Sequence, residues 1–595
     1  MPPETRRAAR EAAERAAAGR SAAPDDHDDS DENQRTSRGR IVGRVILIVV
    51  VLLLALAVWL VIKVVIAKNG LESAQAAVTS IQDGGNVSDA IPKLSSGAAD
   101  AAGAAADPVW RMAELIPGAG DNLRGVRLAA ETLDVFANDV GGPVFKMQED
   151  GQGKILARAL PLIEAAAPEI SKLSSELKGV AASDALIGPV RSGVDQVAEV
   201  AGAAGPMFTL LPKLLGAEEK QNYLLVFQNN AEALPLGGSS ASQTLITADK
   251  GDLEIAGQAS SASFVEGETV DLDISESAKA LYGSRYGSYI NLAPSQPDWP
   301  GVAEMVKAFW NRDIDDTHID GVISVDPIAL QRMLLATGPI EVDGKTLDNK
   351  NAVKTLLSDV YRWWDPYTDP DLKSDAFFAG VASAVFDKIA GGDFNIKDMA
   401  WAVGESIDAG SILAWSEDPD TQKIIAGSGR LSGILPTDNT PETANGVFFR
   451  NVSASKIDYY TKTAVESTMS CADGVTTLTT TATVSLDISQ ADAEDLPRYV
   501  QSRSQRAAYF GTQVYMYAPP GMELASAETT GGASAFRTGN VDLGRVVEPF
   551  QARLRPDGTF TVTATFTGKG DFGPLSVWTT PMINETKTTV TDTCH

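Results

Sequence analysis

The sequence predicts a multidomain α+β protein with a single transmembrane helix, a juxtamembrane α-helical region, a central α/β domain and a C-terminal β-sandwich. Three observations predict this order. Val45–Ile62 is a run of eighteen residues without a charge. Short apolar segments alternate with helical patterns between residues 221 and 435. After residue 450, apolar and polar residues alternate with a period of two, which is typical of half-buried strands.

The apolar run fits a membrane-spanning helix. At about 1.5 Å per residue it reaches roughly 27 Å, close to the hydrocarbon thickness of a bilayer. We therefore predict a signal-anchor at residues 41–67, a disordered cytoplasmic tail at residues 1–40, and a single pass through the plasma membrane that leaves the bulk of the chain extracytoplasmic. The positive-inside rule sets this orientation, because arginines flank the run on its N-terminal side: Arg35, Arg38, Arg40 and Arg44.

The composition excludes several classes of function. The 595 residues carry a formal net charge of −28 with a pI near 4.5. Such an acidic surface excludes nucleic acid as a main partner. Only three histidines occur, His27, His318 and His595, so a multi-histidine metal site is excluded. We predict neither a metal site nor a resident cofactor.

Residues 70–216 predict a membrane-proximal helical region. They are rich in alanine, and apolar residues recur at helical spacing, for example Leu156, Leu160 and Ile163. Breaks such as Pro117-Gly118 separate several helices. Alanine-rich faces let helices approach closely, so we expect a bundle or stalk without chemistry of its own.

Residues 221–435 predict strands that alternate with helices, an α/β layer arrangement. Tyr223–Phe227 and Ile319–Val325 are short apolar runs typical of buried strands. Asp326-Pro327 marks a helix start, with Asp326 as the N-cap and Pro327 at the first helical position.

The polar loop after the first of these strands is the best candidate for a binding site. It ends in a glycine pair, where the backbone can turn or closely approach a ligand. The alternative is a loop whose amides satisfy backbone groups. The candidate binding residues are the polar residues of this loop, the glycine pair and two nearby arginines: Asn229, Asn230, Glu232, Gly237, Gly238, Arg285 and Arg312.

Residues 450–595 predict a β-sandwich. Leu478–Ile488 and Phe560–Phe566 alternate cleanly, and turn signals separate such segments. Cys471 and Cys594 both fall in this part of the chain, outside the membrane by the predicted topology. Exported cysteines usually pair, so we predict a disulfide that joins the two ends of the domain; the alternative is two free buried thiols.

Several motifs in combination resemble those of domain of unknown function family 4012, membrane-anchored envelope proteins common in actinobacteria. The resemblance implies a cell-envelope location but no activity. The family often has an arginine before its Pro-x-Gly-Gly turn, where Leu234 stands in this sequence. The motifs are Asp107-Pro108-Val109-Trp110-Arg111 with Pro117-Gly118-Ala119-Gly120-Asp121-Asn122, Tyr223–Glu232 with Gly237-Gly238, Asp320-Gly321-Val322-Ile323 with Val325-Asp326-Pro327, Gly338-Pro339-Ile340, and Lys456-Ile457-Asp458-Tyr459-Tyr460.

The order of strand, polar loop and hairpin from Tyr223 is also similar to the LytR-CpsA-Psr phosphotransferases, which attach glycopolymers to peptidoglycan from polyprenyl-pyrophosphate carriers. That resemblance implies arginines that hold pyrophosphate and carboxylates that hold magnesium. Ser260–Val265, where the Pro-Arg-Asp signature of these enzymes is expected, has neither arginine nor aspartate. In this resemblance Asn230 could correspond to an aspartate of the first loop, and a neutral amide is a poorer magnesium ligand than a carboxylate. Magnesium is therefore expected only if the protein is such a transferase.

Two further patterns have simpler explanations. Ser453-Ala454-Ser455-Lys456 matches the Ser-x-x-Lys pattern of penicillin-binding proteins, but it runs into a predicted strand, so we interpret it as a chance match. Arg362-Trp363-Trp364-Asp365-Pro366-Tyr367 could stack on sugar rings, yet packing of a helix against a sheet is the commoner role.

Two hypotheses for function follow. The first is a non-catalytic, membrane-anchored cell-envelope protein that binds an envelope glycan, a polyprenyl phosphate lipid carrier or a protein partner. The second is a magnesium-dependent phosphotransferase that attaches glycopolymers to peptidoglycan. A deep apolar tunnel with converging basic side chains would favour the transferase, and a shallow polar face would favour the binding protein.

Overall fold

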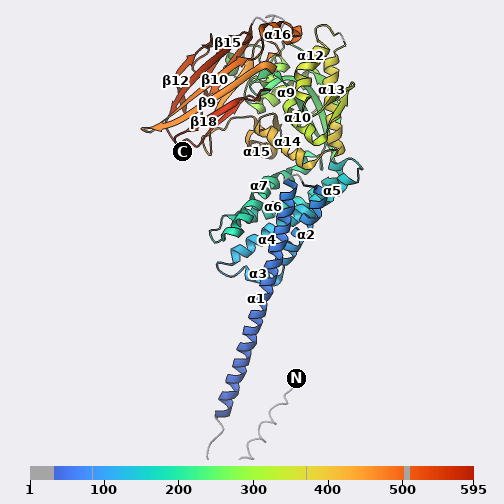
Figure 1. Ribbon diagram of the computed structural model, residues 1–595, viewed down its shortest axis with the longest axis vertical. Helices are drawn as coiled ribbons and strands as arrows, with labels where there is room; N and C mark the ends of the chain where they lie inside the picture. The colour runs from blue at the N-terminus through green and yellow to red at the C-terminus, as the bar shows by residue number, and fades with distance from the viewer. Residues whose placement is uncertain (1–31, 83–84, 370, 502–508) are drawn as a thin grey trace, which may run out of the picture.

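The computed structural model describes residues 32–82, 85–369, 371–501 and 509–595. A head of sheets and helices stands on a helical region, from which one long helix extends (Figure 1). The mixed α+β class with helical, central and C-terminal sheet regions is therefore as predicted. Residues 1–31 of the predicted tail lie outside the described residues, and the long helix α1 (Glu32–Gln82) includes the rest of it.

Helix α1 contains the segment that the sequence predicts to cross a membrane. Within the described ranges, Leu47–Ile81 is the one helical stretch that is long and apolar enough to do so. Large apolar side chains between Leu47 and Ile66 are exposed along it. The protein therefore has one N-terminal apolar helix that could span a bilayer.

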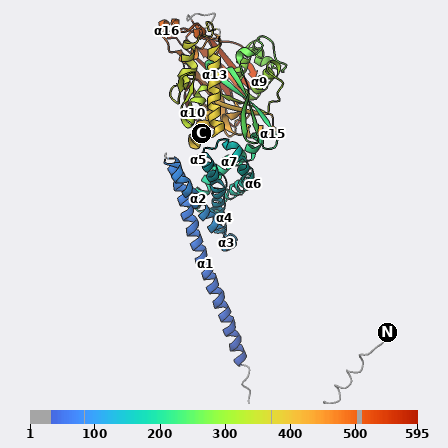
Figure 2. The same cartoon turned by 90° about the vertical axis from the view of Figure 1, so that its right-hand side faces the viewer.

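The helical region packs against the upper half of α1 (Figure 2). Small residues bring α1 and α2 into close contact: a Cβ on Gly70 would lie 2.5 Å from the carbonyl oxygen of Gly97, and one on Gly97 would lie 2.6 Å from that of Gly70. The helices of this region are α2 (Val87–Ala105), α3 (Pro108–Ala113), α4 (Gly120–Asp134), a π-helical segment (Val135–Gly141), α5 (Gly142–Glu149), α6 (Ile155–Ala181) and α7 (Gly188–Leu214).

We expect Gly97→Ala to destabilise the helical region by about 1–3 kcal/mol, because the added methyl group meets backbone atoms of α1 that cannot move aside. Gly103→Ala is the matched control in the same helix. A Cβ there meets open space, so this change should leave the stability of the helical region unchanged or raise it by up to about 1 kcal/mol, because alanine has the higher helix propensity. Thermal unfolding of the full chain in detergent, followed by circular dichroism, checks both. Equal behaviour of the two variants would contradict the tight crossing.

The central domain is built on a mixed five-stranded sheet of order β3-β2-β1-β4-β7. Strand β1 pairs antiparallel with β2 and parallel with β4, and β4 pairs antiparallel with β7. The strands are β1 (Gln221–Leu234), β2 (Gly237–Asp249), β3 (Asp252–Ser260), β4 (Gly321–Val325) and β7 (Ile412–Ser416), with a separate hairpin of β5 (Ile340–Val342) and β6 (Lys345–Leu347).

Helices complete the central domain. Asp326 caps α10 through the backbone N–H of Ala329, and Pro327 follows it, as predicted. The helices are α8 (Glu276–Tyr282), α9 (Trp299–Asp313), α10 (Pro327–Thr337), α11 (Ala352–Lys354), α12 (Val360–Trp363), α13 (Lys373–Gly391), α14 (Ile396–Asp408) and α15 (Pro419–Ala426), with a π-helical segment, Thr355–Asp359, between α11 and α12.

The C-terminal region consists of two sheets, of order β12-β16-β10-β9-β18 and β13-β15-β11-β8-β17, with β14 paired to β15. Burial alternates along β10 and β16, because every second side chain faces the core. The strands are β8 (Thr443–Asn451), β9 (Thr461–Ala472), β10 (Val475–Leu486), β11 (Phe510–Tyr517), β12 (Met522–Thr529), β13 (Ser534–Ala535), β14 (Asn540–Asp542), β15 (Arg545–Leu554), β16 (Thr559–Gly568), β17 (Leu575–Thr579) and β18 (Lys587–Asp592), with short helices α16 (Gln490–Glu494) and α17 (Arg498–Gln501).

The last two strands of the C-terminal region pair with its first two strands. Strands β17 and β18 pair in parallel with β8 and β9, respectively. Next to the second pair, the predicted disulfide joins Cys471 of β9 to Cys594, which follows β18. The apolar core also continues into the central domain, since Leu330 and Phe377 share a buried cluster with Phe449. The central domain and the sandwich therefore share one core.

Candidate functional site

The polar loop singled out in the sequence is a bulge at the end of β1. Strands β1 and β2 are paired at Asn229, opposite Ser239, and again at Ala233, opposite Gly238. Residues 230–232 therefore have no partner in this ladder. The bulge lies at the junction of the central domain and the sandwich, because its side chains contact residues of both.

The two asparagines are buried and hold the bulge in place. Asn229 Nδ2 donates to the hydroxyl of Tyr361 at 2.7 Å. Asn230 Nδ2 donates to Oδ2 of Asp326 at 2.9 Å and to the carbonyl oxygen of Pro581 at 3.0 Å. Since Asp326 is the cap of α10, Asn230 connects the start of this helix to the segment that follows β17.

Glu232 forms an ion pair with a lysine of the C-terminal region. Its Oε1 lies 2.8 Å from Nζ of Lys456, whose side chain is only 5% exposed. Its Oε2 accepts a hydrogen bond from the hydroxyl of Ser239. The Lys456 ammonium also lies 5.0 Å from the ring centre of Tyr361 and 4.8 Å from that of Tyr499.

Lys456 remains protonated at neutral pH. Burial lowers its pKa, but the Glu232 carboxylate and the two tyrosines raise it by more, so that the net pKa lies above the ordinary value. A lysine of this kind is a poor proton acceptor for a serine nucleophile. Ser453 Oγ instead donates to Oδ1 of Asn451 at 2.8 Å and lies 2.9 Å from Oγ of Ser455. The geometry agrees with a chance Ser-x-x-Lys match.

Asp458 is buried beside the same bulge. Its Oδ2 accepts from the backbone N–H of Ala233 at 3.0 Å and from Nδ2 of Asn451 at 2.7 Å, and its Oδ1 accepts from the hydroxyl of Thr461 at 3.0 Å. Burial nevertheless raises the pKa of Asp458 to about 6, because the charged carboxylate loses its hydration.

We expect the free energy of unfolding to fall as the pH rises from about 4 to 6, because of the titration of Asp458. Its pKa in the folded protein is about 6, whereas an unfolded aspartate titrates near 3.9, so the folded state holds the proton over this range. The shift corresponds to about 3 kcal/mol. Asp458→Asn removes the titrating group and should flatten this part of the profile, measured by urea unfolding of the full chain in detergent. Asp487→Asn, on an exposed carboxylate, should leave the fall unchanged.

The glycine pair closes the bulge from the side of β2. Gly237 has a φ of +128°, and a Cβ there would lie 2.4 Å from Oε1 of Gln228. A Cβ on Gly238 would lie 2.2 Å from the carbonyl carbon of Asn229. The Gly238 N–H donates to Gln228 Oε1 at 2.8 Å. The glycine pair therefore lets the backbone of β2 approach the neighbouring strand β1 closely.

The structure does not bring the two candidate arginines to the bulge. Arg285 is exposed, and its guanidinium lies 5.0 Å from the ring centre of Tyr289. Arg312 pairs with Asp313 at 2.7 Å and donates to the backbone carbonyls of Val265 at 3.0 Å and Glu268 at 2.8 Å. Arg312 thus supports the loop after β3, the segment where the transferase signature was expected.

Sequence reasoning did not identify Lys456 and Asp458 as partners of the bulge. Lys456 is 224 residues from Glu232, and only the fold brings them together. One signal was present: both charged residues flank Ile457 in a motif that also carries the family resemblance. Charged residues on either side of a buried apolar one indicate groups that need internal partners.

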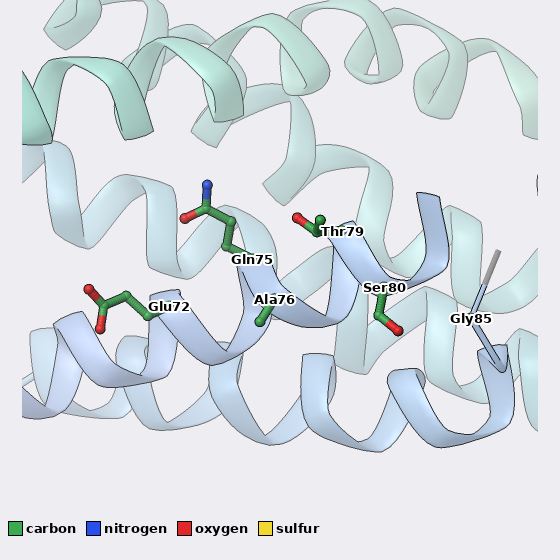
Figure 3. Close-up of a pocket in the computed structure, with 6 residues that line it drawn as sticks. All are labelled: Glu72, Gln75, Ala76, Thr79, Ser80 and Gly85. Atoms are coloured by element: carbon green, nitrogen blue, oxygen red, sulfur yellow. The ribbon is translucent and has the colours of Figure 1, made fainter. Parts of the chain in front are cut away.

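Two hollows lie nearer the membrane helix. One, of about 670 Å³, runs along the upper end of α1, where Figure 3 shows Gln75 and Thr79 pointing to one side and Ser80 to the other. Another, of about 600 Å³, lies between the helical region and the central domain and is lined by several glycines, among them Gly151 and Gly392. Neither set of side chains converges on one point.

A third hollow lies where the central domain meets the sandwich. It has a volume of about 400 Å³ and is lined by Arg362 of α12, by Tyr460, and by carboxylates of α16 and of the loops before α16 and β16. Carboxylates and guanidinium groups bond to hydroxyls, and aromatic rings pack on sugar faces. Beside Arg362, Trp363 is 38% exposed, but its ring packs against Phe377 and lies 4.6 Å from Nζ of Lys345; Trp364 packs against Phe377 as well. The lining residues are Arg362, Tyr460, Asp487, Ile488, Ser489, Asp492 and Asp557.

These features define an α+β protein with one candidate membrane helix, in which a polar bulge joins a central sheet to a sandwich. Residues 218–361 match the family model described as "Protein of unknown function (DUF4012)", which confirms the predicted resemblance over this segment. The match contains all seven candidate binding residues but not Lys456. No curated protein matches the chain.

Two solved structures show a low similarity to the chain. They are the transcriptional regulator yvhJ from Bacillus subtilis, with a TM-score of 0.21, and the Lin1025 protein from Listeria innocua, with a TM-score of 0.20. Each is 15% identical over 36% of this chain and 78% of that chain. Likeness at this level carries no argument about activity.

Proposed function

We propose that this protein is a non-catalytic, membrane-anchored component of the cell envelope that binds an envelope glycan at the hollow beside Arg362 and Tyr460. The observation that carries the proposal is the contrast between two polar clusters. Asn229, Asn230 and Glu232 are engaged in internal bonds at the domain junction. The polar groups at the hollow lie at the surface instead: Asp487 pairs with the exposed Lys462, and Asp492 Oδ2 accepts a hydrogen bond from Ser489 Oγ at 2.6 Å.

The chemistry of the hollow supports a hydroxyl-rich ligand. Asp487, Asp492 and Asp557 supply acceptors for sugar hydroxyls, and the guanidinium of Arg362 supplies donors. The ring of Tyr460 supplies stacking surface. The lining of the hollow is mainly polar, which supports a binding protein rather than a carrier-lipid transferase.

Binding of labelled glycan tests the proposal. The full chain is reconstituted in nanodiscs and titrated with fluorescent, soluble wall-glycan fragments from an actinobacterium. We expect saturable binding that Arg362→Ala weakens at least tenfold, because a planar donor group is lost. Arg285→Ala, which removes another exposed arginine, is the matched control and should bind as the unaltered chain does.

Two outcomes would count against this function. Equal weakening by the Arg285 and Arg362 substitutions would mean that binding reflects charge alone. Transfer of a labelled glycan from a polyprenyl-pyrophosphate donor to peptidoglycan in the presence of Mg²⁺ would establish the transferase instead. Bulge residues such as Glu232 are unsuitable as test positions, because their loss disturbs the domain junction.

A further inference from the structure

The lowest part of the helical region lies beside the apolar segment of α1. Trp59 Nε1 donates to Oδ2 of Asp107 at 3.0 Å, and Lys63 Nζ lies 3.3 Å from the same oxygen. Asp107 is the N-cap of α3, and Trp110 within α3 is fully buried in a cluster that includes Leu60. In both views α3 lies next to the free length of α1 (Figures 1 and 2).

Helix geometry places this contact at the outer edge of a bilayer. If Arg44 marks the cytoplasmic boundary, Trp59 lies about 22 Å and Lys63 about 28 Å further along the helix at ~1.5 Å per residue. The hydrocarbon core is about 30 Å thick. Tryptophan is enriched at this depth, and a lysine near the end of a span extends toward the headgroups. Exposed apolar side chains on α1 continue to Ile66, next to Ala67, which packs in one cluster with Trp110 of α3.

The end of α3 and the loop between α3 and α4 expose apolar side chains, and Glu114 of this loop points inward. Met112, Leu115 and Ile116 are 57%, 84% and 52% exposed. Glu114, which lies among them, pairs with the buried guanidinium of Arg127, with Oε1 2.6 Å from Nε. A loop that faces water normally has the opposite arrangement, with charges outward and large apolar groups packed.

The loop between α6 and α7 lies at the same end of the helical region and exposes both Ile187 and Asp184. Ile187, between α6 and α7, is exposed, and its backbone N–H donates to Oδ1 of Asn122 at 2.8 Å. Asn122 belongs to the first turn of α4, which follows the α3–α4 loop directly. The apolar tips of the two loops therefore lie at the same end of the helical region.

We propose that the α3–α4 loop, with Leu115 and Ile116 in it and Met112 beside them at the end of α3, inserts into the outer leaflet of the bilayer that α1 spans. The occupant of this surface is lipid, because the Trp59–Asp107 hydrogen bond fixes the loop at the depth where the span ends. The contact is apolar and needs no anionic headgroup, so it is compatible with a net charge of −28. It gives the helical region a second attachment to the membrane and limits the tilt of α1 relative to the head.

Site-specific fluorescence quenching tests this insertion in the full chain. One cysteine is added at a time, labelled with an environment-sensitive dye, and studied in nanodiscs that hold one copy each; the native cysteines are joined to each other and do not react. Leu115→Cys is the test position and Leu54→Cys marks the span. Val200→Cys, at a 64% exposed apolar residue of α7, is the matched control. The quenchers are phospholipid with a nitroxide near the top of its acyl chain and aqueous iodide.

We expect lipid nitroxide to quench the dye at position 115 at least threefold more strongly than at position 200, and iodide to show the reverse order. Quenching at position 54 without quenching at position 115 would overturn the proposal and leave the span intact. No quenching at position 54 would overturn the span on which the proposal rests. Protection of position 115 from both quenchers would mean that a protein surface covers the loop, which also overturns insertion.

Discussion

Replacing Glu232 with alanine is expected to lower the free energy of unfolding of the head by about 3–5 kcal/mol, because a buried ammonium is left without its carboxylate. Lys456 lies 2.8 Å from Glu232, and its side chain is 5% exposed while that of Glu232 is 24% exposed, so the ammonium loses its partner at a largely buried position. The hydroxyl of Ser239 also loses its acceptor. Urea unfolding of the full chain in detergent, followed by tryptophan fluorescence, measures the loss.

An exposed ion pair provides the matched control. Lys354 and Asp359 lie 2.7 Å apart, but the lysine side chain is 62% exposed. Asp359→Ala should therefore cost less than about 1 kcal/mol. The double change Glu232→Gln with Lys456→Met should recover part of the loss, because neither buried charge remains. Similar costs for Glu232→Ala and Asp359→Ala would show that the junction does not depend on the buried pair.

Removal of the Cys471–Cys594 disulfide is expected to cost about 4–5 kcal/mol in the chain-entropy model. The bond joins residues 123 positions apart, so its loss releases a long loop in the unfolded chain. Strand β18 carries much of the local effect, because its pairing in the sheet is with β9 alone. We expect Cys471→Ser with Cys594→Ser to lower the urea midpoint and to open residues 587–592 to proteolysis.

Chemical reduction separates the bond from the substitutions. Reductant should lower the midpoint of the unaltered chain to that of the double-serine variant and should leave the variant unchanged. A reductant effect on the variant would point to a different cause. A loss below about 1 kcal/mol would mean that the sheet pairings alone hold the C-terminal strand.

Local patterns predicted most elements of the fold because their causes are local. Asp326 and Pro327 start α10 through a cap and a preset backbone angle, and both act within one helical turn. The alternation along β10 reflects one buried face. Between α11 and α12, in contrast, the chain forms the π-helical stretch Thr355–Asp359. Nothing in its local sequence marks this change.

The sequence predicted the residues of the bulge but not the residues that they bind. Asn229, Asn230 and Glu232 stand out because polar residues follow an apolar strand, and the glycine pair beside them marks a close approach. Their partners depend on distant chain segments: Tyr361 is 132 residues from Asn229, and Pro581 is 351 residues from Asn230. Such pairings result from tertiary packing, which leaves no periodicity or spacing to read.

Two contacts of the head can form only late in synthesis. They are the parallel pairing of β8 with β17 and the hydrogen bond from Asn230 to Pro581. A ribosome delivers Asn230 first and Pro581 only after 351 more residues, at about 5–20 residues per second. Until then the bulge lacks one of its acceptors and β8 keeps an open edge. For a span of roughly 20–70 s the nascent head must therefore be shielded from wrong partners before its native contacts can form.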